Sequence, residues 1–523
     1  MVLSAAWAKR MLGGAQSDSH MSATNAQVTP RIAIIGSGFS GLCLGAHLKK
    51  AGIASFTILE KANRVGGTWR DNTYPGAACD LRAFAYCFSF AQKTDWSRKW
   101  PPQPEILEYM EACARRFDLM RHIRFDSEVT AASFDADAGV WRLRTGNGDE
   151  IEADILVSGV GQLHRPYVPN IPGLETFAGE SFHSARWNHA YDLHGKTVAV
   201  VGNAASAIQF IPEIAKEVQT LYVFQRSANW IMPRGDRPYR AWEKALLRFP
   251  PIAKLSRWFI WAQHELGYAM IVKPGSFLGR RMALRARAFI DAQVADPTLR
   301  EMLVPDYPFG GKRALISDDY YPALNRANVR VVTDGIDHIT RDAIVTKDET
   351  VRSVDAFIFA TGFDTHNFLA PMRITGLDGR VLGEVWKDGA EAYLGITVPG
   401  FPNLFLMYGP NTNLGHNSII FMIECQTRYI MDALRQMRRD GLAFIDVRPE
   451  VMAAFNRKIQ TELAHTTWAL TDHSWYKTAD NRITNNWPGT TIAYWWRTRR
   501  CDLDDYRHAR HPSAAALQTS RAA

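Results

Sequence analysis

The chain has 523 residues, of which 46% are hydrophobic, 22% charged and 11% aromatic. This composition is typical of a folded enzyme and excludes disordered, collagen-like and disulfide-scaffold proteins. At about 150 residues per domain, the length corresponds to two to four domains. The net charge of +8 fits an enzyme that handles anionic cofactors as well as weak nucleic-acid association, so charge alone decides nothing.

The cysteines and the apolar stretches exclude further classes. The six cysteines are scattered without a C-x-x-C pair or a Cys/His cluster, so we expect no metal, no disulfide framework and a cytoplasmic protein. The most membrane-like stretch, 249–272, contains Lys254, Arg257 and Glu265, and we therefore expect no transmembrane segment. Residues 1–30 lack the apolar core of a secretory signal and are interpreted as a flexible leader, in which Met21 is a second candidate start.

The first nucleotide-binding pattern begins at residue 31. The β-rich run RIAIIG leads into G-S-G-F-S-G (36–41), a helix-like stretch and a second strand that ends at Glu60. In such a βαβ unit the first glycine forms a tight turn, the second lets the backbone approach a pyrophosphate, and the third lets the helix pack on the strand. Glu60 lies 19 residues after Gly41, where an acid accepts hydrogen bonds from an adenosine ribose. The predicted FAD contacts of this unit are Gly36, Gly38, Phe39, Gly41 and Glu60.

A second unit begins at residue 196, where the strand KTVAVVG leads into G-N-A-A-S-A (202–207), a helix and the strand TLYVFQR. Ala204 replaces the middle glycine, and a Rossmann-like unit that binds nothing is the alternative. Arg226 lies 19 residues after Ala207, as Glu60 does after Gly41, and a cation at this place suits the 2′-phosphate of NADP. An ordinary surface arginine is the alternative here. The predicted NADP contacts are Gly202, Asn203, Ala204, Ala205, Ser206, Ala207, Gln209 and Arg226.

Two apolar runs that end in glycine, 153–161 and 354–364, have the pattern of buried parallel strands and mark the crossings between the units. We predict an α/β fold with two Rossmann-like dinucleotide-binding domains, for FAD and NADP, and a helical insert. The predicted segments are 1–30 (leader), 31–164 (first part of the FAD domain), 165–355 (NADP domain, with the insert at about 236–305), 356–500 (second part of the FAD domain and substrate-pocket segments) and 501–523 (polar tail).

Two long motifs resemble the fingerprints of Baeyer–Villiger monooxygenases. The segment F-A-G-E-S-F-H-S-A-R-W-N (177–188) follows F-x-G-x-x-x-H-x-x-x-W and departs only at Asn188, where the family has Pro or Asp. The segment G-G-T-W-R-D-N-T-Y-P-G-A-A-C-D (66–80) matches [AG]-G-x-W-x-x-x-x-[FY]-P-[GM]-x-x-x-D at every fixed place. From about residue 31 to residue 500 the chain thus resembles a type I Baeyer–Villiger monooxygenase of the flavin-containing monooxygenase superfamily.

The resemblance implies an NADPH-dependent flavin monooxygenase of the EC 1.14.13 type, which converts ketones to esters or lactones through a C4a-peroxyflavin. The cofactors implied are FAD and NADPH, and the partners are a small ketone and O2, with no nucleic acid. The cofactor supplies the reactivity, while the protein supplies positive charge and excludes water.

The resemblance also implies roles for single residues. In G-G-K-R (310–313), Lys312 would join Arg226 and Ser227 around the NADP phosphate, and Arg313 would be the catalytic arginine over the flavin. Asp80 would hold that arginine. Trp475 resembles the tryptophan that contacts the nicotinamide ribose, and the loop 409–417 resembles the flavin-side loop. The further FAD contacts implied are Thr68, Trp69, Asp80, Tyr86 and Val129.

Other interpretations remain open. His183 is more often a structural histidine than a catalyst, and Trp69 and Trp187 could be core aromatics. An amine or sulfide oxygenase needs less positive charge, so Arg313 and Asp80 count against it. A flavin disulfide reductase would need a redox-active cysteine pair, which the sequence lacks. A non-enzymatic FAD/NADP redox sensor would show no turnover. The patterns do not specify the ketone, the regioselectivity or the oligomeric state.

Overall fold

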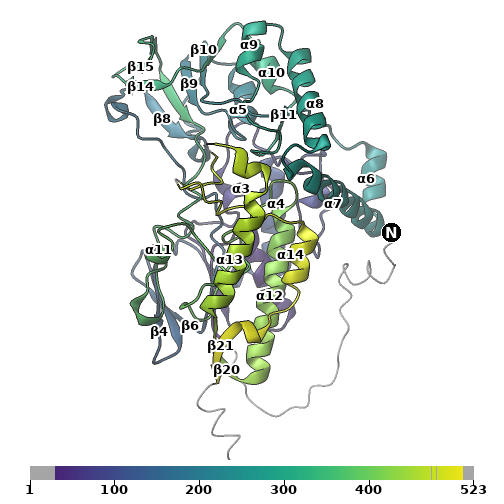
Figure 1. Ribbon diagram of the computed structural model, residues 1–523, viewed down its shortest axis with the longest axis vertical. Coiled ribbons are helices and arrows are strands. Elements are labelled where there is room, and N and C mark those ends of the chain that lie inside the picture. Colours follow the sequence, from purple (N-terminus) through teal and green to yellow (C-terminus); the bar gives the residue numbers. More distant parts are fainter. Residues whose placement is uncertain (1–29, 473, 479, 511–523) are drawn as a thin grey trace, which may run out of the picture.

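The computed structural model describes residues 30–472, 474–478 and 480–510 (Figure 1). The predicted leader, apart from Pro30, lies outside these residues, as do Met21 and residues 511–523 of the predicted tail. Within the described part of the chain, no helix is long and apolar enough to cross a membrane.

The first sheet is parallel, with the strand order β19-β7-β1-β2-β3. Its strands are short apolar runs whose side chains are mostly buried on both faces, as expected for a parallel sheet covered on both sides. Helix α2 (Phe39–Lys50) connects β1 to β2 and packs on the long helix α12. The strands are β1 (Ile32–Ile35), β2 (Phe56–Leu59), β3 (Ile123–Arg124), β7 (Ile155–Ser158) and β19 (Leu404–Leu406).

The second sheet is also parallel, with the order β13-β10-β9-β17-β8. Helices α5 (Ala207–Ile214) and α10 (Tyr320–Leu324) contact each other beside it. Strand β17 pairs with β9 and β8, so this sheet continues past residue 355, where the sequence predicts the NADP domain to end. The strands are β8 (Glu180–His183), β9 (Thr197–Val201), β10 (Thr220–Phe224), β13 (Val329–Val332) and β17 (Ala356–Phe359).

Smaller sheets attach to these two. Strands β4 (Val129–Asp135), β5 (Val140–Thr145) and β6 (Glu150–Ala153) form an antiparallel meander joined by β18 (Arg373–Thr375), and β14 (Ile336–Ile339), β15 (Ala343–Thr346) and β16 (Val351–Ser353) form another. Two pairs complete the set: β11 (Ile231–Met232) with β12 (Leu315–Ile316), and β20 (Leu442–Val447) with β21 (Tyr506–Arg510). Strand β21 lies within the predicted polar tail, where it pairs with β20 and buries Tyr506, which is 1% exposed.

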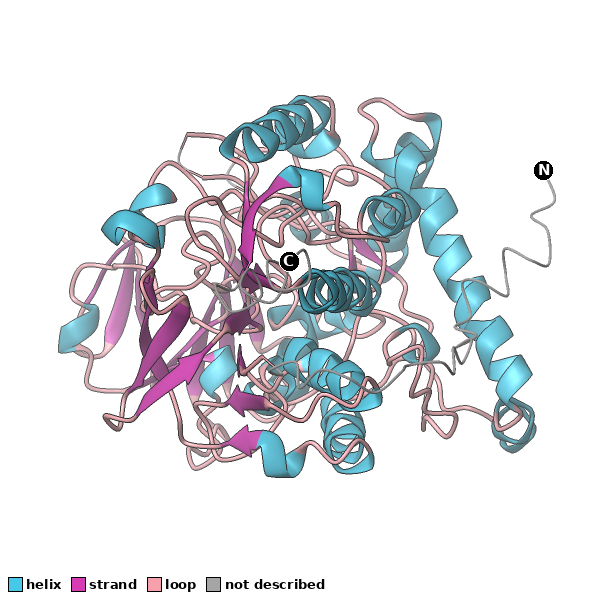
Figure 2. Ribbon diagram, turned by 90° about the horizontal axis from the view of Figure 1, so that it is seen from below, coloured by secondary structure: helices cyan, strands magenta, loops and turns pink. Residues whose placement is uncertain are grey.

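The remaining helices lie between and outside the sheets. Helices α6 (Ala241–Leu247), α7 (Pro250–Val272), α8 (Phe277–Gln293) and α9 (Pro297–Met302) form the predicted insert, and its long helices lie along one outer edge of the molecule (Figures 1 and 2). The others are α3 (Thr68–Asp71), α4 (Gln103–Arg116), α11 (Leu382–Val385), α12 (Ile419–Asp440), α13 (Pro449–Ala464) and α14 (Thr491–Arg497). Short 3₁₀ turns span Ala83–Ala85, Met120–His122, Leu174–Thr176, Ser184–Arg186, Leu377–Gly379, Thr467–Leu470 and Leu503–Asp505. The predicted fold class is confirmed.

Candidate functional site

A cavity of about 680 Å³ opens beside the first sheet, where β1 and β2 end. This volume is in the range of ligand sites. Its walls come from the glycine-rich turn, the 66–71 segment, the residues after β7 and the segment 369–372. Of the predicted FAD contacts, those that line the cavity are Gly36, Gly38, Phe39, Glu60, Thr68, Trp69, Tyr86 and Val129. Gly41 and Asp80 do not line it.

The three glycines of the first turn differ in why they must be glycine. Gly36 has φ +97°, and a Cβ atom there would lie 2.9 Å from the carbonyl oxygen of Gly159. A Cβ atom at Gly41 would overlap the carbonyl oxygen of Gly36, so this glycine lets the helix pack on the strand. Gly38 has an ordinary φ of −75°, and its nearest neighbour, the Cα atom of Gly67, would be 4.0 Å away. The protein itself therefore tolerates a side chain at Gly38, and the space beside it is open to a ligand.

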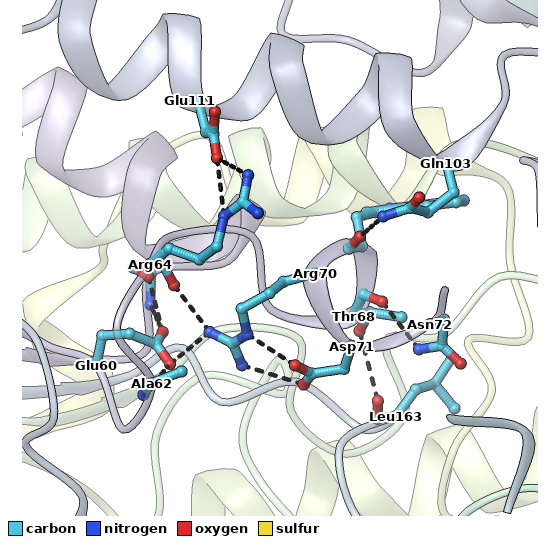
Figure 3. Close-up of polar contacts among 12 residues, drawn as sticks. Glu60, Ala62, Arg64, Thr68, Arg70, Asp71, Asn72, Gln103, Glu111 and Leu163 are labelled. Carbon is cyan, nitrogen blue, oxygen red and sulfur yellow. Dashed lines mark hydrogen bonds and ion pairs between the residues drawn. The ribbon is translucent and has the colours of Figure 1, made fainter. Parts of the chain in front are cut away.

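Glu60 is buried at the end of β2, and its carboxylate is already partnered (Figure 3). Its Oε2 accepts from the backbone N and the Oγ of Ser37 at 2.9 and 2.7 Å, and its Oε1 accepts from the backbone N of Ala62 at 3.0 Å and from Nη1 of Arg70 at 2.8 Å. Burial raises the pKa of Glu60, but Arg70 and the hydrogen bonds outweigh it, and the pKa lies below its usual value. Because a carboxylate has about four acceptor positions, a ribose hydroxyl would have to replace or share one of these donors.

Arg70 lines the same cavity and bridges Glu60 and Asp71. Its Nε donates to Oδ1 of Asp71 at 2.7 Å, and its Nη1 also donates to the carbonyl oxygen of Arg64 at 3.0 Å (Figure 3). Sequence reasoning missed this residue because it occupies a variable place of the 66–80 fingerprint. The charged residues that border the cavity are the cations Lys61, Arg70, Arg165 and Arg186 and the acids Glu60, Asp71 and Glu128.

Aromatic side chains form part of the cavity wall. The indole Nε1 of Trp69 donates to the hydroxyl oxygen of Tyr86 at 2.9 Å, and the two rings meet edge to face with centroids 5.5 Å apart. Phe39 packs on Tyr86 with centroids 5.4 Å apart. The amide of Gln103 bonds the carbonyl oxygen of Trp69, which fixes the backbone of α3 against α4 (Figure 3). Trp69 is therefore both a packing residue and part of the cavity wall.

In the second glycine-rich turn, the first residue, Gly202, and the last residue, Ala207, are closely packed. Gly202 has φ +106°, and a Cβ atom there would lie 2.5 Å from the carbonyl oxygen of Ala360, while Ala207 is fully buried. Ala204 and Ala205 are exposed, so their methyl groups face outward from the turn. The amide of Asn203 donates to Oε1 of Gln225 at 2.9 Å and to the carbonyl oxygen of Ser227 at 3.0 Å, which ties the turn to the end of β10.

Two cations meet beyond this turn. The Nζ of Lys312 donates to Oγ of Ser227 at 3.1 Å and lies 4.6 Å from the ring centroid of Tyr307. Burial, followed by the charge of Arg226, lowers the pKa of Lys312. Within the described part of the chain, neither Arg226 nor Lys312 forms an ion pair with a carboxylate. An anion bound between them would relieve this repulsion, so the place suits a phosphate.

Gln209 connects the two units. Its Oε1 accepts from the hydroxyl of Tyr74 at 3.0 Å and from the backbone N of Ala78 at 3.2 Å, and its Nε2 donates to the carbonyl oxygen of Ala78 at 3.0 Å. Nearby, a Cβ atom at Gly76 would lie 2.6 Å from the carbonyl oxygen of Gln209. The 66–80 fingerprint is thus packed directly on helix α5.

Arg313 and Asp80 form an ion pair. The Nε of Arg313 donates to Oδ2 of Asp80 at 2.7 Å, and its Nη1 donates to the carbonyl oxygen of Leu414 at 3.3 Å. The two side chains are 32% and 33% exposed, so the pair remains accessible. The charge of Asp80 raises the pKa of Arg313, which keeps the guanidinium charged at every accessible pH. Among the described residues, no acceptor contacts its Nη2, which leaves N–H groups for a reacting oxygen.

A polar group that sequence reasoning missed lies beside Arg313. Glu265 of α7 is 6% exposed, and its carboxylate accepts from Oγ1 of Thr491 at 2.8 Å, from Nδ2 of Asn417 at 3.0 Å and from the backbone N of Ile492 at 3.2 Å. The Nε2 of His416 lies 3.5 Å from its Oε2. In the sequence, Glu265 is an acid within an apolar stretch. This position is the signal that could have predicted a buried carboxylate with hydrogen-bond donors around it.

The two histidines of this group have open nitrogens. His416 stacks on Tyr268 with centroids 3.5 Å apart, and burial lowers its pKa although Glu265 opposes the shift. Burial also lowers the pKa of His264 to about 4, and the charge of Arg313 contributes. Among the described residues, the Nδ1 of His416 and the Nε2 of His264 are buried and have no hydrogen-bond partner, whereas the Nε2 of His416 faces Glu265. The charge of Arg313 contributes to the lowered pKa of both histidines, so they belong to the surroundings of Arg313.

The predicted nicotinamide contact, Trp475, is 39% exposed and packs on Tyr476 with centroids 4.5 Å apart. Its carbonyl oxygen accepts from Nδ2 of Asn485 at 2.9 Å and from Oγ1 of Thr365 at 3.2 Å. The backbone is therefore held while the indole is free to contact a ligand. Burial raises the pKa of the neighbouring Tyr476 to about 12, so its hydroxyl is protonated.

Residues of the 177–188 fingerprint make local packing and hydrogen-bond contacts. The Nδ1 of His183 accepts from the backbone N of Ala185 at 3.1 Å, and burial lowers its pKa to about 4, which keeps the ring neutral. Trp187 packs on Phe210 of α5 with centroids 5.2 Å apart. Asn188, at the place where the motif departs, donates from Nδ2 to Oε1 of Glu180 at 2.8 Å and so ties the end of the segment to β8.

Comparisons with known proteins agree with this geometry. A family model described as flavin-binding monooxygenase-like matches residues 29–249. A protein named Baeyer–Villiger monooxygenase from Streptomyces coelicolor is 44% identical over 480 residues, which is 91% of this chain and 92% of the relative. One of the same name from Pseudomonas aeruginosa is 41% identical over 497 residues, 94% of each protein. The crystal structure of OTEMO in complex with FAD and NADP superimposes with a TM-score of 0.84 at 26% identity, covering 92% of this chain and 99% of that one.

Proposed function

The chain belongs to the family of Baeyer–Villiger monooxygenases, and from that premise we propose that it uses FAD, NADPH and O2 to oxidise a ketone to an ester or lactone. The observation that carries the proposal is the ion pair between Arg313 and Asp80, which presents a fixed and accessible guanidinium. The chemistry that FAD supplies when bound is the acceptance of a hydride and the activation of O2.

The residues of the first unit fit FAD. The open space at Gly38 suits a pyrophosphate, because the protein alone does not require a glycine there. The remainder of the site would be lined by Thr68, Trp69, Tyr86 and Val129. Glu60 would accept a hydrogen bond from the ribose after one of its present donors is displaced. We assign FAD to residues 31–164 and 356–500, with β17 contributing to the other sheet.

The residues of the second unit fit NADPH. Arg226 and Lys312 would bind the 2′-phosphate, with Ser227 holding Lys312 in place. The turn 202–207 would hold the pyrophosphate, and Trp475 would contact the nicotinamide ribose. Gln209 supports this site indirectly, since both ends of its amide bond residues of the first unit. We assign NADP to residues 165–355 together with β17.

Arg313 would stabilise negative charge that develops on oxygen during the reaction. A guanidinium fixed by Asp80 and by the carbonyl oxygen of Leu414 needs no reorientation when that charge appears, which is the condition for strong electrostatic stabilisation. A heteroatom oxygenase for amines or sulfides has less use for such a charge. The six cysteines are all free and buried, which suits a reducing cytoplasm.

The proposal is tested by assaying the purified protein with a panel of aryl, cyclic and long-chain ketones and analysing the products by mass spectrometry. We expect consumption of NADPH coupled to the formation of an ester or lactone that is one oxygen heavier than the ketone. The same panel should contain a tertiary amine and a thioether. Oxidation of these two alone would assign the heteroatom activity instead, and the absence of any turnover by the FAD-loaded protein would assign a redox sensor.

A further inference from the structure

The helical insert carries an unusual share of the exposed apolar surface. Nineteen large hydrophobic side chains are exposed among the described residues, and nine of them lie in α6–α8, residues 241–293. Single exposed hydrophobic residues are normal, whereas a concentration of them marks an interaction surface. These nine residues are Trp242, Leu246, Phe249, Leu255, Trp258, Phe259, Leu266, Phe277 and Leu284, and we call them the apolar insert surface.

The exposure on α7 follows the helical period, so it belongs to one face. Leu255, Trp258 and Phe259 are 65%, 46% and 56% exposed, while Ala253 and Ile260 are buried. The inner face is firmly attached. Nη1 of Arg257 donates to the carbonyl oxygens of Phe84 and Cys87 at 3.1 and 2.6 Å, and the buried Glu265 bonds α14. The outer face is therefore held outward, and both views place this helix at the edge of the molecule (Figures 1 and 2).

The exposed charges of the same segment are almost all positive. Within residues 241–293 the exposed cations are Arg248, Lys254, Lys273, Arg280, Arg281, Arg285 and Arg287, against the single exposed anion Asp291. The acids Glu243 and Glu265 are not exposed. Aromatic and leucine side chains interspersed with arginine and lysine are typical of helices that lie in the interface of an anionic bilayer.

We propose that the apolar insert surface and its cations dock the protein on an anionic lipid bilayer, with α6, α7 and α8 lying in the interface. This inference concerns a surface on the opposite side of α7 from Arg313 and its surroundings, and it does not depend on the reaction. A second copy of the chain is a poorer occupant, because a twofold interface places this cationic surface against itself. Nucleic acid would match the charge but not the exposed leucine and phenylalanine side chains.

The experiment is co-sedimentation of the FAD-loaded full chain with vesicles of phosphatidylcholine, with and without phosphatidylglycerol. We expect strong binding only to the anionic vesicles, weakened by salt. Trp258→Ser with Phe259→Ser should lower the partition coefficient at least about tenfold, because the apolar contact is lost. Arg280→Gln with Arg281→Gln should lower it at least about tenfold on anionic vesicles, at about 1 kcal/mol for each cation near the surface.

Trp496→Ser is the matched control, because this tryptophan is 57% exposed but lies on α14 outside the insert. It should bind vesicles like the parent protein. All variants are first compared by thermal unfolding and by FAD content, and only folded ones are scored. The proposal is overturned if the parent protein does not bind anionic vesicles, or if it binds both vesicle types equally without a salt effect. It is also overturned if sedimentation velocity shows a dimer that the Trp258→Ser/Phe259→Ser variant abolishes, since a second copy is then the occupant.

Discussion

Asp80 and Arg313 are separated by 233 residues, yet the Nε of Arg313 donates to Oδ2 of Asp80 at 2.7 Å. Asp80 ends the fingerprint that follows the first βαβ unit, and Arg313 precedes β12 in the segment that follows the second. The pair therefore forms only when the two units dock. The amide of Gln209 and the close approach at Gly76 fix that docking through α5.

Arg313→Ala should reduce ester formation at least about a hundredfold, the scale of one lost donor to a developing oxyanion. FAD binding should persist, because Arg313 does not line the cavity of the first unit. Reduction of the bound flavin by NADPH should also remain, since hydride transfer develops no comparable negative charge on oxygen. Anaerobic stopped-flow reduction compared with product formation in air separates the two steps. Wild-type ester yield from this variant would contradict the role given to the guanidinium.

Asp80→Asn should lower ester formation in the same direction but less than Arg313→Ala. An asparagine oxygen still accepts from Nε, whereas the negative charge that raises the pKa of Arg313 is lost. The double variant Asp80→Asn/Arg313→Ala should be no worse than Arg313→Ala alone, because the two residues act as one unit. Additive losses in kcat for product formation would show that Asp80 acts independently of the arginine.

Arg226→Ala should raise the KM for NADPH about tenfold to a hundredfold while changing the KM for NADH little, since a charge-assisted hydrogen bond contributes about 1.5 to 3 kcal/mol. Lys312→Ala should act in the same direction, because its Nζ lies beside Ser227 with no carboxylate partner among the described residues. Arg330→Ala is the matched control, because among the described residues the side chain of this β13 arginine donates to the backbone carbonyls of Ala327 and Val329. Equal losses with both cofactors would refute the assignment to the 2′-phosphate.

Gly38→Ala should weaken FAD binding at least about tenfold without destabilising the apoprotein, because the added methyl group meets only the Cα atom of Gly67 at 4.0 Å. Gly41→Ala should instead destabilise the apoprotein by at least about 1 kcal/mol, as overpacking does, because its methyl group overlaps the carbonyl oxygen of Gly36. Isothermal titration with FAD and chemical unfolding of the two apoproteins measure these effects. A stable Gly38→Ala protein with unchanged FAD affinity would show that the pyrophosphate binds elsewhere.

Asp446→Asn should stabilise the protein at neutral and alkaline pH. Burial raises the pKa of Asp446 to about 6, although the backbone N of Gly400 donates to its Oδ1 at 2.9 Å. In the unfolded chain the pKa of this carboxyl is near 4, so between pH 4 and about pH 6 the folded protein holds a proton on Asp446 that the unfolded chain has lost. The stability contributed by this group is therefore present at low pH and is lost as the pH rises through about 6. The free energy of unfolding of the variant relative to the parent should thus increase by about 2 to 3 kcal/mol from pH 4 to pH 8. Glu150→Gln, at a side chain 69% exposed, is the control.

The fold and the outline of the site could be predicted because they depend on local patterns. Glycine spacing, apolar runs and the residue 19 positions further on specify each βαβ unit, and the insert follows from helical periodicity. The partners of buried charges could not be predicted. Arg70 forms an ion pair with Glu60, although it stands at a variable position of its motif. Glu265 accepts hydrogen bonds from a loop and a helix that are more than 150 residues away in the sequence. Such pairs depend on packing between segments that are distant in the sequence, so the spacing of residues does not predict them.

The crossing of the chain between the two sheets limits how the protein can be divided. The polypeptide leaves the first sheet after β7, completes the second sheet with β17, and returns to the first only with β19, which pairs with β7. A truncation anywhere between these two strands removes β19 and leaves the backbone of β7 as an open edge, a template for aggregation. We expect that the first unit cannot be expressed as one contiguous soluble fragment, whereas the strands of the second sheet all lie within the single stretch from β8 to β17.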